Sequence, residues 1–160
     1  MRIKQLLIGI TASVIAISSY VEIAIADLKF PMLVYRTGAY APNGIPNADG
    51  FVDYYKMINA RDGGIGGEKI FHPECETGYK TQVGVECYEK NKKDAMVFQP
   101  MSTGITYQLI PKATADGVTV YSTGYGRTSA ANGKVFKWIF NAPVTSVSYT
   151  HLTLPTIVDV

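Results

Sequence analysis

Residues 94–106 constrain the fold of this chain more than any other stretch. Ala95–Phe98 is a short apolar run between an aspartate and the pair Gln99-Pro100, which is typical of a buried central strand. A Ser102-Thr103-Gly104 turn follows, and apolar residues then recur at helical spacing from Ile105 to Ala113. Either hydroxyl residue is a suitable helix N-cap. The stretch therefore predicts a strand that passes directly into a helix N-terminus.

A helix N-terminus at the end of a strand offers groups that can bind an anion. Its first backbone N–H groups have no partner within the helix, and the helix dipole adds a partial positive charge. Together with the hydroxyls of Ser102 and Thr103, these groups could hold a carboxylate or a phosphate. The alternative is that one hydroxyl only caps the helix, because most helix N-termini bind nothing but their own caps.

Strands and helices are predicted to alternate along the chain. Apolar and β-branched runs predict strands, and apolar residues at helical spacing predict the helices between them. The predicted strands are 31–35, 68–72, 95–98, 117–122 and 136–140, and the predicted helices are 46–62, 80–93 and 103 onward. Pro111 is expected to kink the last helix or to end it early. The alternation predicts an α/β fold, with an open parallel sheet and helices on both faces.

Three loops are predicted at the carboxyl edge of this sheet. They are Gly38–Gly44, Met101–Gly104 and Gly124–Thr128, and all are rich in Gly, Ser, Thr or Tyr. In open parallel sheets, ligands bind beyond the carboxyl ends of the strands, where the strand order reverses. The loops lack the paired acids, bases and nucleophiles of an active site, so they favour binding over catalysis.

The first 26 residues are typical of a secretory signal peptide. Arg2 and Lys4 precede an apolar run at 6–17, which is shorter than the roughly 20 residues that span a bilayer. Ala24-Ile25-Ala26 is an A-x-A cleavage site. The alternative is an uncleaved membrane anchor. After cleavage, 13 basic and 12 acidic residues would remain, a net charge of +1 that gives no indication of nucleic-acid binding.

The two cysteines, Cys75 and Cys87, would then meet an oxidising compartment. We expect them to form a disulfide; free thiols are the alternative, since pairing needs Cα atoms within about 7 Å. The cluster His72-Pro73-Glu74-Cys75-Glu76 crowds several metal-ligating types. However, alternate side chains of a strand point in opposite directions, so no zinc site is expected. We predict neither a metal nor a cofactor.

Six short stretches together resemble one family: the periplasmic substrate-binding proteins of branched-chain amino acid and amide (urea-type) ABC importers, which have the type I periplasmic-binding fold. Their order and spacing carry the resemblance, which runs from about residue 31 to residue 143. The stretches are LVYRTG (33–38), NARDGGI (59–65), ECETGY (74–79), GVECYE (84–89), STGIT (102–106) and GYGRT (124–128).

The resemblance implies two α/β lobes that close on a ligand, with residues 27–143 forming part of the first lobe. First-lobe groups would hold the ligand's carboxylate and ammonium. The implied ligand-binding residues are Ser102, Thr103, Gly124, Tyr125, Gly126, Tyr40 and Asn43. For Tyr125, simple packing is the alternative. The implied partners are a small amino acid or amide and a membrane permease, with no nucleic acid, and the implied protein is a periplasmic monomer.

Two further expectations follow from the resemblance. Residues 144–160 look like a translated sequencing-adapter tail and are predicted to be non-native, with a genuine divergent C-terminus as the alternative, and the second lobe is expected to be missing. The chain alone should therefore have little affinity for an amino acid. An exported ligand-sensing domain of a receptor or regulator with the same fold is the alternative function.

Overall fold

The main sheet contains five parallel strands in the order β4-β2-β5-β6-β7. The computed structural model describes residues 27–122, 130 and 132–141. Two further strands, β1 and β3, pair in a separate parallel sheet. The strands are β1 (Leu28–Lys29), β2 (Met32–Val34), β3 (Ile70–Phe71), β4 (Glu74–Glu76), β5 (Val97–Pro100), β6 (Thr119–Ser122) and β7 (Ile139–Asn141). The helices are α2 (Ala41–Arg61), α3 (Thr81–Asn91) and α4 (Thr103–Asp116).

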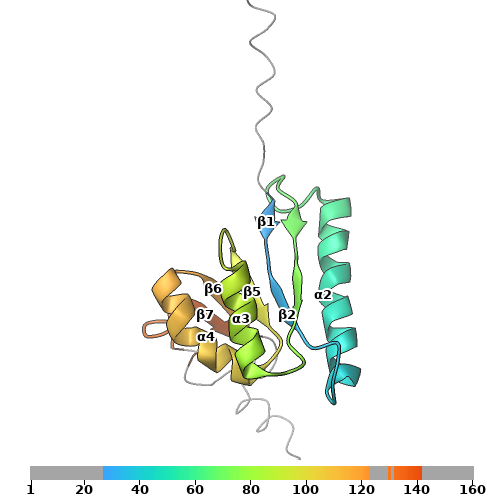
Figure 1. Cartoon of the computed structure of the whole chain (residues 1–160). Coiled ribbons are helices and arrows are strands. Elements are labelled where there is room, and N and C mark those ends of the chain that lie inside the picture. Colours follow the sequence, from blue (N-terminus) through green and yellow to red (C-terminus); the bar gives the residue numbers. More distant parts are fainter. Residues whose placement is uncertain (1–26, 123–129, 131, 142–160) are drawn as a thin grey trace, which may run out of the picture.

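Helices cover both faces of the sheet, as predicted. Figure 1 shows α2 on one side of the strands and α3 with α4 on the other. Alternate residues of β2 explain this arrangement, since successive side chains of a strand point to opposite faces. Met32 and Val34 pack in one apolar cluster with Tyr55 of α2, while Leu33 packs in another with residues of α3 and α4. The predicted α/β fold is therefore confirmed.

The strand order reverses beside β2. After β2 the chain forms β4 on one side of it, and then β5 on the other side. Val34 is level with Glu76 of β4, and Leu33 is level with Pro100 of β5. The carboxyl ends of these three strands thus lie side by side at one edge, and ligands of open α/β sheets bind at such a reversal.

One strand of the main sheet was not predicted. The sequence Glu-Cys-Glu of β4 has too few apolar residues to indicate a strand, because β4 lies at the sheet edge and pairs only with β2. The run at 68–72, which was predicted to be a main strand, contributes β3 to the small sheet instead. Both strands lie at sheet edges. Fewer of their side chains are buried there, so the hydrophobic pattern that indicates a strand is weakest.

Helix α2 begins five residues earlier than predicted. Pro42, rather than Pro46, occupies the first turn, and Pro46 lies inside the helix. Gly44 is buried, and a Cβ atom on it would overlap the backbone and ring of Tyr35. The absence of a side chain at Gly44 lets the first turn pack against the end of β2. The predicted loop Gly38–Gly44 is therefore wrong in its second half, which is helical.

Helix α4 continues through Pro111 to Asp116, so the expected early end does not occur. Pro111 is exposed, whereas Leu109 and Ala113 on either side of it are fully buried. Burial of this apolar face stabilises the helix enough for it to continue, although Pro111 has no backbone N–H group to donate. The helix ends at Gly117, whose φ of +67° gives a left-handed C-cap that favours glycine.

Cys75 and Cys87 form the expected disulfide, with Cα atoms 5.9 Å apart. The bond joins the edge strand β4 to the second turn of α3 and holds both against the core. No helix in the described part of the chain is long and apolar enough to cross a membrane.

Candidate functional site

Ser102 lies between the end of β5 and the start of α4. Its backbone is extended, with φ −151° and ψ 128°, and its side chain caps the helix by accepting a hydrogen bond from the N–H of Ile105 at 3.4 Å. The residue is only 5% exposed, and the first turn of α4 contains no acidic side chain. Ser102 is thus the predicted N-cap, and the positive end of the helix is not neutralised by the helix itself.

Two hydroxyl groups connect this turn to the next strand. Thr106 donates from Oγ1 to the carbonyl oxygen of Ser102 at 2.9 Å, and its Oγ1 lies 3.3 Å from Oγ of Ser122. Because the single proton of Thr106 is already donated, Ser122 is the donor in the second contact. Ser122 ends β6 and is buried, so the segment that follows β6 starts at the same edge as Ser102. The predicted site residues Gly124, Tyr125 and Gly126 lie outside the described residues.

The N-termini of α3 and α4 meet at this edge. A Cβ atom on Gly104 would lie 3.3 Å from Oγ1 of Thr81 and 3.8 Å from Oγ of Ser102. Thr81 is the first residue of α3, whose first turn also contains no acidic side chain. Two helix N-termini with unneutralised dipoles therefore face the same region, with Thr103 half-buried beside them.

The loop after β2 carries the aromatic part of the edge. Tyr40, a predicted site residue, is 54% exposed and occupies the N-cap position of α2. Its ring centroid lies 4.5 Å from that of Tyr79, which is 4.8 Å from that of Tyr35. Asn43 is exposed but lies in the first turn of α2, not in a loop as predicted. Tyr40 and Ser102 are thus the N-cap residues of the helices that follow residues 36–39 and the adjacent strand β5, and Asn43 belongs to the helix.

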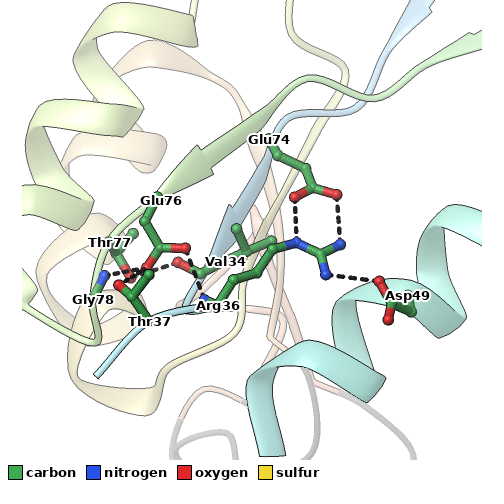
Figure 2. Close-up of polar contacts among 8 residues, drawn as sticks. All are labelled: Val34, Arg36, Thr37, Asp49, Glu74, Glu76, Thr77 and Gly78. Atoms are coloured by element: carbon green, nitrogen blue, oxygen red, sulfur yellow. Dashed lines mark hydrogen bonds and ion pairs between the residues drawn. The ribbon is translucent and has the colours of Figure 1, made fainter. Parts of the chain in front are cut away.

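A carboxylate that the sequence indicated only as a member of a metal-ligating cluster holds this loop. Glu76 accepts hydrogen bonds from the N–H groups of Arg36 and Gly78, both at 2.7 Å, and from the hydroxyl of Thr37 at 3.1 Å (Figure 2). Burial alone would raise the pKa of Glu76, but these hydrogen bonds outweigh it and lower that pKa below its ordinary value. The loops after β2 and β4 are therefore tied together through one side chain.

Arg36 continues this network toward α2. Its guanidinium binds Glu74 through two hydrogen bonds, of 2.7 and 2.8 Å, and Asp49 through a third of 2.7 Å. These bonds, those to Glu74 first, raise the pKa of Arg36. Figure 2 shows the guanidinium between the carboxylates of β4 and α2. The spacing of Glu74 and Glu76, which places both on one face of a strand, was the sequence signal that could have indicated this network.

Within the described ranges, no three His, Cys, Asp or Glu side chains gather in a way that could hold a metal ion. In the cluster at residues 72–76, Cys75 is in the disulfide and Glu74 binds Arg36. The edge instead offers hydroxyls, helix N–H groups and aromatic rings, which suit reversible binding of a small organic anion.

The sequence profile of the periplasmic binding protein family matches residues 27–153. The chain belongs to this family. The match includes part of the segment 144–160. Membership implies an extracytoplasmic location, and solute binding is the shared property of the family and of its structural neighbours. Among curated proteins, none is detectably similar to the chain.

Solved structures share the type I fold of this periplasmic binding protein. A protein of the Pseudomonas fluorescens group, described as an ABC transporter permease, is 40% identical, with a TM-score of 0.67 over 74% of this chain and 29% of its own. LivJ of Streptococcus pneumoniae, a branched-chain amino acid binding protein solved with isoleucine, is 20% identical, with a TM-score of 0.65 over 75% and 34%.

A solute-binding protein of R. palustris solved with benzoate is 19% identical, with a TM-score of 0.59 over 72% of this chain and 32% of its own. The chain thus spans about a third or less of the length of these structures. At these identities, the second and third structures support the fold of this periplasmic binding protein rather than its ligand.

Proposed function

We propose that this chain is part of the solute-binding component of an ABC importer. It would capture a branched-chain amino acid or a related small amide in the periplasm and deliver it to a membrane permease. Residues 1–26 would direct its export, and the working protein would be a monomer with a second lobe. Its work would be reversible binding without catalysis or a cofactor.

One observation carries this proposal: Ser102 lies at the helix N-terminus beside the reversal of strand order. Its hydroxyl is close to the first turns of α3 and α4, which contain no acidic side chain. A ligand carboxylate placed there would accept hydrogen bonds from N–H groups of the first turn of α4 and from the hydroxyls of Ser102 and Thr103. A serine that accepts one capping hydrogen bond still has its own proton to donate.

The relatives support a ligand of this kind. LivJ was solved with isoleucine and the R. palustris protein with benzoate, and a protein of Thermomonospora curvata is described as a fatty acid ABC transporter substrate-binding protein. These ligands are carboxylates with an apolar part, which agrees with an edge built from helix N-termini and tyrosine rings. The loop Gly124–Gly126 would add backbone groups and the ring of Tyr125.

The proposal is tested by recovering the surrounding reading frame from the neighbouring DNA, expressing the two-lobed protein that we expect it to encode, and titrating that protein by isothermal calorimetry. The probes are leucine, isoleucine, valine, benzoate and urea. Micromolar binding of at least one probe is expected, and no binding of any probe would contradict the proposal. For the 160-residue chain alone we expect no micromolar binding, because half of a cleft leaves most of the ligand in water.

A further inference from the structure

Tyr79 has an unusual backbone conformation at the edge described above. Its φ is +62°, in the left-handed region that bulky side chains avoid. Among the described residues, the one other non-glycine residue with positive φ is Asp94, a type that tolerates this conformation. Gly78, immediately before Tyr79, is itself left-handed at +54°. A second glycine would suit position 79 better on backbone grounds, so the ring of Tyr79 needs its own explanation.

The turn holds Tyr79 in place through four hydrogen bonds. The N–H of Tyr79 donates to Oγ1 of Thr77 at 3.2 Å, and Thr77 donates from that hydroxyl to the carbonyl oxygen of Val34 at 2.8 Å. On either side, Gly78 donates to Glu76, and the N–H of Lys80 donates to the carbonyl oxygen of Thr77 at 2.9 Å. Thr77 is 2% exposed, so the strained residue follows a buried and hydrogen-bonded threonine.

This turn directs the ring outward, over the loop after β2. The ring of Tyr79 lies edge-on to Tyr35 at 4.8 Å and tilted against Tyr40 at 4.5 Å. A Cβ atom on Gly38 would lie 3.8 Å from the carbonyl oxygen of Gly78, so the two turns touch. Even so, 38% of Tyr79 and 54% of Tyr40 are exposed. The backbone and its hydrogen bonds thus hold a pair of rings in place, yet much of the surface of the pair remains open.

The open rings lie on the same edge as Ser102. Tyr79 is two residues before Thr81, the first residue of α3, and the hydroxyl of Thr81 is close to Gly104 and Ser102. The polar helix N-termini and the aromatic pair are therefore consecutive parts of one edge. A small molecule with a carboxylate and an apolar group could contact both.

We propose that Tyr79, with Tyr40, forms an aromatic wall that contacts the apolar part of a small carboxylate ligand. The inference rests on the function proposed above and adds a specificity-determining residue to it. Flat apolar or branched groups would pack against the exposed ring faces, which exclude water from that side of the ligand. A ligand without an apolar group, such as urea, would gain nothing from this wall.

The test is a titration series on the two-lobed protein with isoleucine, benzoate and urea. Tyr79→Gly and Tyr79→Asn both accept the left-handed backbone and remove the ring, so at least one of them should fold as well as the wild type. We expect both to weaken binding of the apolar carboxylate by about tenfold or more. Tyr79→Phe should restore most of the lost affinity, because it keeps the ring.

Asp94→Gly is the matched control. It relieves the same kind of backbone strain at the other end of β5, away from the edge, and should leave the affinity unchanged. Thermal unfolding of each variant separates loss of binding from loss of folding.

The outcomes separate this inference from the proposed function. If Ser102→Ala weakens binding while the ring-removing variants bind within twofold of the wild type, the aromatic wall is wrong and the proposed function remains. Binding of urea alone would also overturn the wall and leave the proposed function in place. If none of the three probes binds the wild type, the aromatic wall is overturned, and the proposed function is overturned as well if leucine and valine also fail to bind.

Discussion

The hydroxyl oxygens of Thr106 and Ser122 lie 3.3 Å apart and join helix α4 to the end of strand β6. Both residues are almost completely buried, with exposures of 0% and 1%. Thr106 also bonds the carbonyl oxygen of Ser102. The cap of α4 and the start of the segment after β6 are therefore held in one arrangement by a short series of hydroxyl contacts.

Thr106→Val should destabilise the protein by about 1–3 kcal/mol, because it keeps the shape of the side chain but leaves the buried hydroxyl of Ser122 without its acceptor. Urea unfolding of the mature chain measures this free energy. Ser122→Ala should lower the free energy of unfolding less in the Thr106→Val variant than in the wild type, since the two hydroxyls interact. Fully additive losses would show that the contact contributes nothing.

Gly84→Ala should also destabilise the protein, by about 1–3 kcal/mol. Gly84 is buried in α3, and a Cβ atom there would come within 2.6–2.7 Å of three side-chain atoms of the fully buried Ile105. Crowding then outweighs the better helix propensity of alanine. The matched control is Gly50→Ala in α2, where a Cβ atom meets nothing within 4 Å.

Gly50→Ala should stabilise the protein by up to about 1 kcal/mol, the usual advantage of alanine over glycine within a helix. Unfolding midpoints of both variants, measured side by side, check the pair. Equal effects of the two substitutions would contradict the close packing of α3 against α4.

Replacing Cys75 and Cys87 together by serine should lower the free energy of unfolding by about 2–4 kcal/mol, because the disulfide closes a short loop in the unfolded chain. Urea unfolding with and without a reductant tests this. The wild type should become less stable when reduced, while the double variant should not respond. If the reductant did not change the free energy of unfolding of the wild type, the predicted stabilisation by the disulfide would be wrong.

Glu76 should make stability depend on pH in the acid range. Its folded-state pKa is below the ordinary value of 4.5, so the folded protein binds fewer protons than the unfolded chain there. Its contribution is therefore complete above pH 4.5 and is lost as the pH falls through the lowered value. In Glu76→Gln, the fall of stability with acid should be shallower, as measured by urea unfolding at several pH values. If the free energies of unfolding of the wild type and Glu76→Gln fell in parallel with decreasing pH, the predicted contribution of Glu76 would be wrong.

Much of the fold could be predicted from the sequence, because its signals are local. The apolar run before Pro100 and the hydroxyls after it indicated β5, the N-cap Ser102 and α4, and the structure confirms all three. The disulfide partners were also predicted correctly. Helix α2 was predicted to start late, because the contact that permits its first turn joins Gly44 to Tyr35, nine residues earlier.

The candidate site was less accessible to sequence reasoning. Tyr40 and Ser102 lie in the segments that follow the neighbouring strands β2 and β5, as expected, but Asn43 lies in a helix. The roles of Glu76 and Tyr79 were missed. That of Glu76 depends on backbone groups of another loop, for which the spacing of Glu74 and Glu76 was the available sequence signal, and that of Tyr79 depends on a left-handed φ, which leaves no pattern in the sequence. The ligand-binding roles of all the implied residues, Ser102, Thr103, Gly124–Gly126, Tyr40 and Asn43, stay predictions.

Carboxylate binding at Ser102 is tested most directly by a crystal structure of the two-lobed protein with its bound ligand, isoleucine or benzoate in the first instance. We predict that the ligand carboxylate lies at the N-terminus of α4, within hydrogen-bond distance of Oγ of Ser102 and of the first N–H groups of the helix. A carboxylate bound elsewhere, with Ser102 only capping its own helix, would contradict the central claim.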